Sequence, residues 1–158
     1  MANSSAGRLI QISVNPQGGV PKRAVPSALI TARGVAGDKQ RSRRFHGGPR
    51  RAVSLYSSER IQSLQAEGHP IAPGSTGENL TIAGLDWGAL QIGDRLRVGE
   101  LLIEITSYAA PCANIAGSFA GGDPKRIGQK LHPGWSRLYA AVLAEATVRV
   151  GDLVAIER

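Results

Sequence analysis

The sequence predicts a mostly β fold, a closed or nearly closed β-barrel that carries a few short helices. Apolar and polar residues alternate with a period of two in several short runs, a pattern typical of half-buried strands. Turn residues separate these runs every eight to twelve positions, and the 158 residues include 20 glycines and 9 prolines. Short strands at this spacing favour a closed or nearly closed barrel, and a closed barrel leaves loops from distant parts of the chain around one mouth.

One domain spanning residues 1–158 is expected, with residues 1–7 as a loose tail. Residues 34–49 are rich in glycine and arginine and lack periodicity, so this segment is predicted to be a loop. A helix capped by Ser57 or Ser58 runs to about Glu67, and another short helix is expected at 125–130. The predicted strands are, in chain order, residues 8–14, 28–32, 52–56, 79–82, 95–98, 101–106, 135–143 and 153–156.

A predicted hairpin over residues 95–106 directs the chain towards Cys112, the one cysteine of the sequence. Pro111 ends the second strand and suits the first turn of a helix, which is expected to run to about Phe119. Backbone N–H groups at a helix start favour the thiolate form of a cysteine, which is the better nucleophile and metal ligand. Cys112 is therefore the candidate catalytic and metal-binding residue, against the alternative of a buried apolar cysteine.

A second candidate site is the basic loop at residues 41–51, in which glycines lie among arginines. Arginine binds phosphate through two donors, and adjacent glycines let backbone N–H groups approach an anion. A solvated loop or a nonspecific nucleic-acid contact is the alternative, but aromatic residues make up only 4% of the chain and none are interleaved with the arginines to stack bases. The candidate residues of this loop are Arg41, Arg43, Arg44, His46, Gly47, Gly48, Arg50 and Arg51.

The third candidate is Gly77-Glu78-Asn79, a turn before a predicted strand. The Asn79 amide offers donors and acceptors to a polar ligand, and Glu78 could hold neighbouring backbone or a basic partner. His69 and His132 lie in proline-containing loops and are expected to be structural. No histidine pair has metal-ligand spacing, which argues against a zinc site.

The bulk composition limits the class of protein. A formal net charge of +7 favours an anionic partner without naming it, and the single cysteine fits a reducing compartment, so we expect a cytoplasmic protein. The sequence has no apolar run of transmembrane length, no P-loop and no G-x-S-x-G motif, so neither a membrane span nor these hydrolase or nucleotide chemistries are expected.

Four blocks of sequence, taken together and in order, resemble the MOSC domain, which occurs in molybdenum cofactor sulfurases, in amidoxime-reducing enzymes and as stand-alone bacterial proteins. They are His46–Tyr56, Gly77–Leu85, Gly93–Cys112 and His132–Asp152. The resemblance implies a MOSC-type barrel and a pterin-based molybdenum cofactor. It also implies that Cys112 is the molybdenum ligand or the sulfur-bearing residue, and that the basic loop and residues 78–79 contact the cofactor.

The resemblance leaves two activities open. One is reduction of N-hydroxylated substrates, and the other is carriage of sulfur on Cys112 for cofactor or metal–sulfur cluster sulfuration. Either needs a redox or desulfurase partner protein, and no pyridoxal phosphate is expected in this chain. The alternatives are a non-catalytic cofactor carrier or storage module, or a basic nucleic-acid-binding protein.

Overall fold

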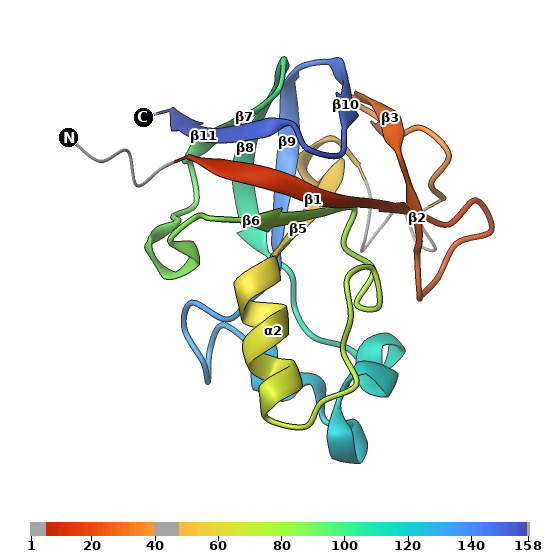
Figure 1. Cartoon of the computed structure of the whole chain (residues 1–158), viewed down its shortest axis with the longest axis vertical. Helices are drawn as coiled ribbons and strands as arrows, with labels where there is room; N and C mark the ends of the chain where they lie inside the picture. The colour runs from red at the N-terminus through yellow and green to blue at the C-terminus, as the bar shows by residue number, and fades with distance from the viewer. Residues whose placement is uncertain (1–5, 40–47, 158) are drawn as a thin grey trace.

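A computed structural model describes residues 6–39 and 48–157, and its central feature is a closed ring of seven strands (Figure 1). The ring follows the order β11-β7-β8-β9-β5-β6-β1, and β1 then pairs with β11 through Gly7–Val154 and Arg8–Leu153. Each neighbouring pair is antiparallel except β5 and β6. The strands of the ring are β1 (Gly7–Val14), β5 (Val53–Ser57), β6 (Leu80–Ala83), β7 (Arg95–Val98), β8 (Leu101–Tyr108), β9 (Leu138–Ala144) and β11 (Leu153–Glu157). The predicted barrel is confirmed.

The inside of the ring is filled by the apolar residues of the alternating runs. Leu9, Leu55, Leu80, Leu96 and Ile103 come from five different strands, and each is fully buried. Burying one such side chain contributes about 1.5–3 kcal/mol. The period-two alternation therefore fixes which face of each strand turns towards the core. This sets the register of the strands, and the register sets which loops lie at each end of the barrel.

Helix α2 (Ser58–Ala66) makes the crossover that the parallel β5–β6 pair requires, and it packs Ile61 and Leu64 against the core. Ser57 is its N-cap, as predicted, because its Oγ accepts a hydrogen bond from the backbone N–H of Arg60 at 3.1 Å. Figure 1 shows α2 and the cyan 3-10 helices together at one end of the barrel. The 3-10 helices are η1 (Pro49–Arg51), η2 (Trp87–Ala89), η3 (Ala113–Ser118), η4 (Ala120–Gly122) and η5 (Pro124–Ile127).

A second sheet lies beside the ring and was only partly predicted. It joins β10 (Ala146–Arg149), β3 (Ser27–Thr31) and β4 (Gly34–Val35), while β2 (Arg23–Val25) extends β1 at its edge. We expected β3, but β10 was missed and β4 was taken as part of a loop. The expected strand 135–143 begins only at Leu138, for the reason given below, and the expected helix at 125–130 is the shorter η5.

Candidate functional site

One pocket collects most of the candidate residues that the structure describes. It encloses roughly 630 Å³, its open mouth included. Its walls come from the loop at 19–22, Lys39, Arg51 and Ser54, the loop at 76–79, the segment 112–115, and Arg137 with Tyr139. Four lining residues are basic (Lys22, Lys39, Arg51 and Arg137), and no acidic side chain is among the described lining residues. Such a lining favours an anionic ligand.

Cys112 lies in the pocket wall, half-buried, and its thiol makes no hydrogen bond with any described residue. The expected helix starting near Pro111 is instead η3, a six-residue 3-10 helix for which Cys112 is the N-cap. So short a helix does little to favour the thiolate form of Cys112. Cys112 remains a candidate metal ligand because it lies in the wall of a basic pocket.

Arg137 is the functional candidate that sequence reasoning missed. Its side chain is buried, the residue being 7% exposed, and it donates from Nη1 to the carbonyl oxygen of Thr76 at 2.8 Å and from Nη2 to that of Ala110 at 3.3 Å. Its buried Nε has no partner, and no carboxylate of the described residues forms an ion pair with it. Because a buried charge normally has a counter-charge, this guanidinium is suited to a ligand anion.

The segment before Arg137 is held by side chains rather than by a neighbouring strand. The Trp135 ring makes cation–π contacts with two guanidinium groups, with the Cζ atoms of Arg60 and Arg126 at 4.3 Å and 4.1 Å from the ring centroid. Three successive carbonyls accept side-chain hydrogen bonds: Gly134 from Arg60 (3.0 Å), Trp135 from Tyr56 (2.7 Å) and Ser136 from Trp87 (2.9 Å). This bonding explains why β9 starts late, and it fixes the backbone that carries Arg137.

Burial raises the pKa of the Tyr56 phenol above its usual range, and the nearby cationic Arg137 partly opposes this effect. The phenol therefore stays protonated at neutral pH and keeps its hydrogen bond to Trp135.

Lys22 and Asn79 are joined in the pocket wall by Asp38. One carboxylate oxygen of Asp38 accepts from Lys22 Nζ at 2.7 Å and from Asn79 Nδ2 at 2.8 Å, and the other accepts from the backbone N–H of Asn15 at 2.8 Å. The remaining groups of the Asn79 amide bond to Ser13 and Ser54. The amide that we expected to face a ligand is thus already engaged within the protein.

Glu78 is fully buried and organises the loop at 74–79. Its carboxylate accepts from the backbone N–H of Gly74 (2.9 Å) and from the hydroxyls of Thr76 (2.7 Å) and Thr81 (3.0 Å). Gly74 has a φ of +84°, and a Cβ there would lie 2.7 Å from the carbonyl oxygen of Lys22. The loop can therefore pack against the Lys22 backbone only with glycine at this position.

The described residues of the basic loop at 41–51 have different surroundings. Arg51 lines the pocket, with its guanidinium carbon 5.2 Å from the centre of the Tyr139 ring, whereas Arg50 is exposed and does not line it. The backbone carbonyl of Arg50 accepts a hydrogen bond from Thr106. Gly48 is the N-cap of η1 and is not among the lining residues. Arg41, Arg43, Arg44, His46 and Gly47 lie outside the described residues.

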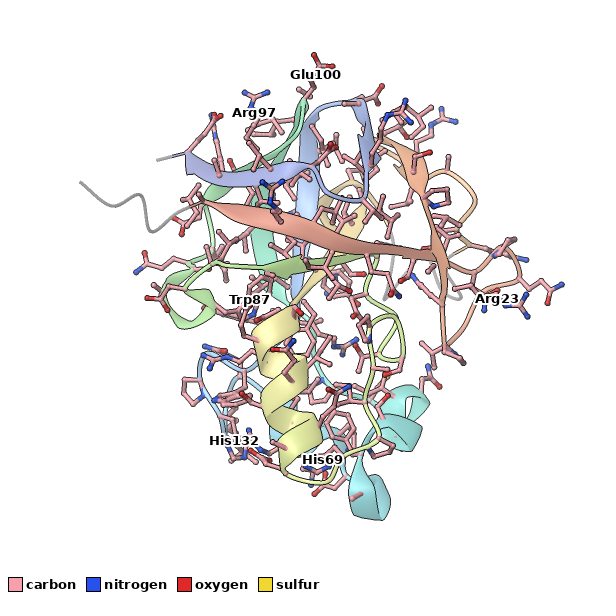
Figure 2. The ribbon with its side chains drawn as sticks, in the orientation of Figure 1. Arg23, His69, Trp87, Arg97, Glu100 and His132 are labelled. Carbon is pink, nitrogen blue, oxygen red and sulfur yellow. The ribbon has the colours of Figure 1, made fainter. Side chains whose placement is uncertain are left out.

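The two described histidines lie away from the pocket. Figure 2 shows His69 and His132 at the α2 end of the molecule, and His69 Nδ1 accepts from the backbone N–H of Ala120 at 3.0 Å. Within residues 6–39 and 48–157 no three His, Cys, Asp or Glu side chains are grouped so that they could hold a metal ion. No helix in the same part of the chain is long and apolar enough to cross a membrane.

Comparison with known proteins identifies the class to which this barrel and pocket belong. The family model for the MOSC domain matches residues 42–155, so the chain belongs to the MOSC domain family. The match includes Arg51, residues 76–79, Cys112 and Arg137, and therefore most of the pocket.

Among the relatives is the uncharacterized protein YflK of Bacillus subtilis, 32% identical over 84% of this chain and 60% of its own length. The protein YiiM of Escherichia coli is 29% identical over 72% of this chain and 52% of its own length. The chain thus spans between about half and three fifths of these relatives. A crystal structure of a hypothetical protein superimposes with a TM-score of 0.76 and 26% identity over 98% of this chain and 70% of its own chain.

Proposed function

We propose that this protein binds a molybdenum cofactor in the basic pocket, with Cys112 as the metal ligand, and that it reduces N-hydroxylated compounds. The observation that carries the proposal is the pairing, in one pocket, of a thiol and a buried guanidinium, where the thiol forms no hydrogen bond and the guanidinium no ion pair with any residue that the structure describes. A soft thiolate suits molybdenum, and a phosphate group suits arginine. Membership of the MOSC family supports the same ligand.

The described residues fit such a group in chemistry and in charge. Arg137 would supply positive charge to the cofactor's phosphate, and Lys39 and Arg51 would add to it at the pocket wall. Lys22 is held in place by Asp38, so less of its charge is available to a ligand. The bound cofactor would supply two-electron redox chemistry, and the protein would supply the thiolate and the cationic wall.

The reaction has a simple balance: R–NH–OH takes up two electrons and two protons and yields R–NH₂ and water. The N–O bond breaks and the nitrogen is reduced. Both electrons must come from a donor outside the described residues, which contain a single cysteine and no grouping of side chains that could hold a metal.

The proposal is tested by Cys112→Ser in protein purified from a host that makes the cofactor. Serine keeps the shape of the side chain but is a poorer ligand, so we expect normal folding with molybdenum content reduced at least about tenfold. Phosphate-dependent thermal stabilisation, which depends on Arg137, should persist in the variant. Unchanged molybdenum per folded protein would contradict the proposal, and cofactor that binds without any reductive turnover would favour the carrier alternative.

Sulfur carriage is the second candidate, and the accessible, unbonded thiol of Cys112 favours it. A desulfurase partner would convert free cysteine to alanine and leave one extra sulfur atom on Cys112 as a persulfide. Intact-mass analysis after incubation with a cysteine desulfurase and cysteine measures this directly. A mass gain of one sulfur that is lost in Cys112→Ser supports carriage, and no gain excludes it for that donor.

A further inference from the structure

Two ionisable groups of opposite charge are buried in the same wall of the basic pocket, and they do not contact each other. Glu78 is 0% exposed and Arg137 is 7% exposed. Neither forms an ion pair with a side chain in the described part of the chain. The donors that bond to the Glu78 carboxylate are neutral: the backbone N–H of Gly74 and the hydroxyls of Thr76 and Thr81. Because buried charges normally have a counter-charge, each group has one that direct contact does not supply.

Thr76 joins the two groups. Its carbonyl oxygen accepts a hydrogen bond from Arg137 Nη1 at 2.8 Å, and its hydroxyl donates to Glu78 Oε1 at 2.7 Å. The guanidinium and the carboxylate are therefore separated by two hydrogen bonds and one buried residue. Burial is the main cause that raises the pKa of Tyr56, and Arg137 lowers this pKa while Glu78 raises it, so both charges act on the same phenol. Charges buried this close together attract each other because solvent screens them weakly.

The two charges have different access to a ligand. Arg137 and Thr76 line the pocket, whereas Glu78 lies behind the lining. An anion in the pocket is therefore attracted by the guanidinium and repelled by the carboxylate behind Thr76. Asp38 also bonds to residues of the wall, but it is paired directly with Lys22 at 2.7 Å. The charge of Glu78 has no such direct partner among the described side chains, so more of its field reaches the pocket.

We infer that Glu78 is a remote counter-charge for Arg137 and that it sets the affinity and the charge preference of the pocket for anions. In the empty protein it partly compensates the guanidinium through Thr76. When an anion binds, the repulsion from Glu78 lowers the affinity in proportion to the charge on the anion, which keeps binding reversible. Glu78 contacts no ligand and acts as a positioning residue. The inference rests on the proposed function in one respect, that the pocket binds an anionic group.

Glu78→Gln is the matched variant, because glutamine fits the hydrogen bonds of the carboxylate. Its carbonyl oxygen can replace Oε2, which accepts from Gly74 and Thr81, and its amide can replace Oε1 and donate to the Thr76 hydroxyl, which is also an acceptor. If Glu78 only held the loop, the variant should bind anions equally well or more weakly. If its charge opposes the anion, the variant should bind more tightly, so the two roles predict different signs.

The probes are methyl phosphate, which is a dianion in mildly alkaline buffer, and dimethyl phosphate, a monoanion with the same tetrahedral centre. Each is titrated calorimetrically into cofactor-free protein at constant ionic strength. We expect Glu78→Gln to lower the Kd by about threefold for the monoanion and by about ninefold for the dianion, because Coulomb energy is proportional to the ligand charge. A purely structural change of the loop would not separate the two probes in this way.

Two controls make the result specific. Glu78→Asp keeps the charge and shortens the side chain, so it should preserve the ratio of the two Kd values even if the altered loop changes both. Glu100→Gln removes the same charge from the exposed turn between β7 and β8, at the upper tip of the molecule in Figure 2. It should alter either Kd by less than about twofold, because an exposed charge is screened by solvent.

A double-variant cycle tests the coupling in the empty protein. Glu78→Gln and Arg137→Gln each leave one buried charge without its remote partner, so the double variant should lose less free energy of unfolding in urea than the sum of the two single losses. If Glu78→Gln does not fold, the titrations compare Arg137→Gln with the double variant, which should again bind the dianion more tightly.

Four results would overturn the inference: an unchanged or raised Kd of methyl phosphate in Glu78→Gln, equal responses of the two probes, no binding of methyl phosphate by either protein, or an additive cycle. Failure of the proposed function is a separate result, because it would be measured as molybdenum content, and none of these titrations uses molybdenum.

Discussion

Arg137 is buried and positively charged, and its Nε has no hydrogen-bond partner among the described residues. An anion bound in the pocket would neutralise the charge of its guanidinium. In the free protein this charge has two carbonyl partners but no ion pair with a described carboxylate, so its burial should oppose folding. The same side chain is therefore expected to lower the stability of the empty protein and to raise that of the occupied one.

Replacing Arg137 with glutamine should separate these effects. Arg137→Gln removes the unfavourable buried charge but also weakens the hydrogen bonds to the carbonyls of Thr76 and Ala110, so the two effects should largely offset and the free energy of unfolding in anion-free buffer should change by less than about 1 kcal/mol. Inorganic phosphate at about 100 times its Kd stabilises a binding protein by about 2.7 kcal/mol, and the variant should lose most of this gain. The measurement is the midpoint of thermal unfolding against phosphate concentration, with sodium chloride at matched ionic strength as control. Equal stabilisation of both proteins would remove Arg137 from the site.

Arg50 and Arg51 form a natural matched pair, because they are adjacent and only Arg51 lines the pocket. Arg51→Gln should weaken phosphate binding by about three- to tenfold, whereas Arg50→Gln should leave it unchanged because an exposed charge outside the site contributes little. Isothermal titration of both variants checks this. A larger effect of Arg50→Gln would show that the described geometry does not govern anion binding.

Arg50 and Arg51 also show how much of the anion site could be predicted from the sequence at the level of single residues. The composition of residues 41–51 indicated an anion site, but nothing in it distinguished Arg50 from Arg51, since the difference depends on the turn at Pro49. Arg137 could have been suspected from its position directly before the apolar residues of β9. Its importance depends on the burial and missing counter-charge that only the tertiary structure shows.

Among the elements, α2 was predicted accurately because a local signal defines its start. Ser57→Ala removes the cap and should lower the free energy of unfolding by about 1 kcal/mol, or by roughly 2–4 °C in the midpoint for a domain of this size. Ser58→Ala is the control, because Ser58 lies inside the helix, where alanine is at least as favourable. Calorimetry of both variants tests the assignment, and equal destabilisation would contradict it.

Elements defined by distant partners were predicted less well. β10 is a four-residue strand whose pairing with β3 joins residues more than 110 positions apart, so no local pattern marks it. The late start of β9 depends on hydrogen bonds from Tyr56, Arg60 and Trp87, which lie far away in the sequence. Strands with strict alternation, such as β7 and β8, were predicted well because one face of each is buried in the core.

For the whole molecule, stability should fall in alkaline solution in a way that depends on Tyr56. The pKa of this phenol is raised in the folded state, so above its ordinary value of about 10 the unfolded chain releases a proton that the folded protein retains. Its contribution is complete below that pH and is lost as the pH rises further, with a slope of up to about 1.4 kcal/mol per pH unit.

Tyr56→Phe removes this ionisation and is the matched variant. It should be less stable at neutral pH by about 0.5–1.5 kcal/mol, because the hydrogen bond to the Trp135 carbonyl is lost. The difference between the two proteins should narrow as the pH rises from 9 to 11, as measured by urea unfolding. A constant difference over that range would show that Tyr56 is not the group responsible.

The barrel closes where β1 meets β11, and this seam joins the two ends of the described chain through two residue pairs (Figure 1). Gly7 and Val154 are separated by nearly the whole sequence, so this contact has almost the largest loop-closure entropy that the chain allows. During synthesis β2 can cover residues 12–14 of the outer edge of β1, but residues 7–8 stay unpaired until β11 has emerged and the ring can close. Until then the edges of β1 and β7 are open to pairing with other chains, so slow translation should favour aggregation and a chaperone that shields strand edges should improve the yield.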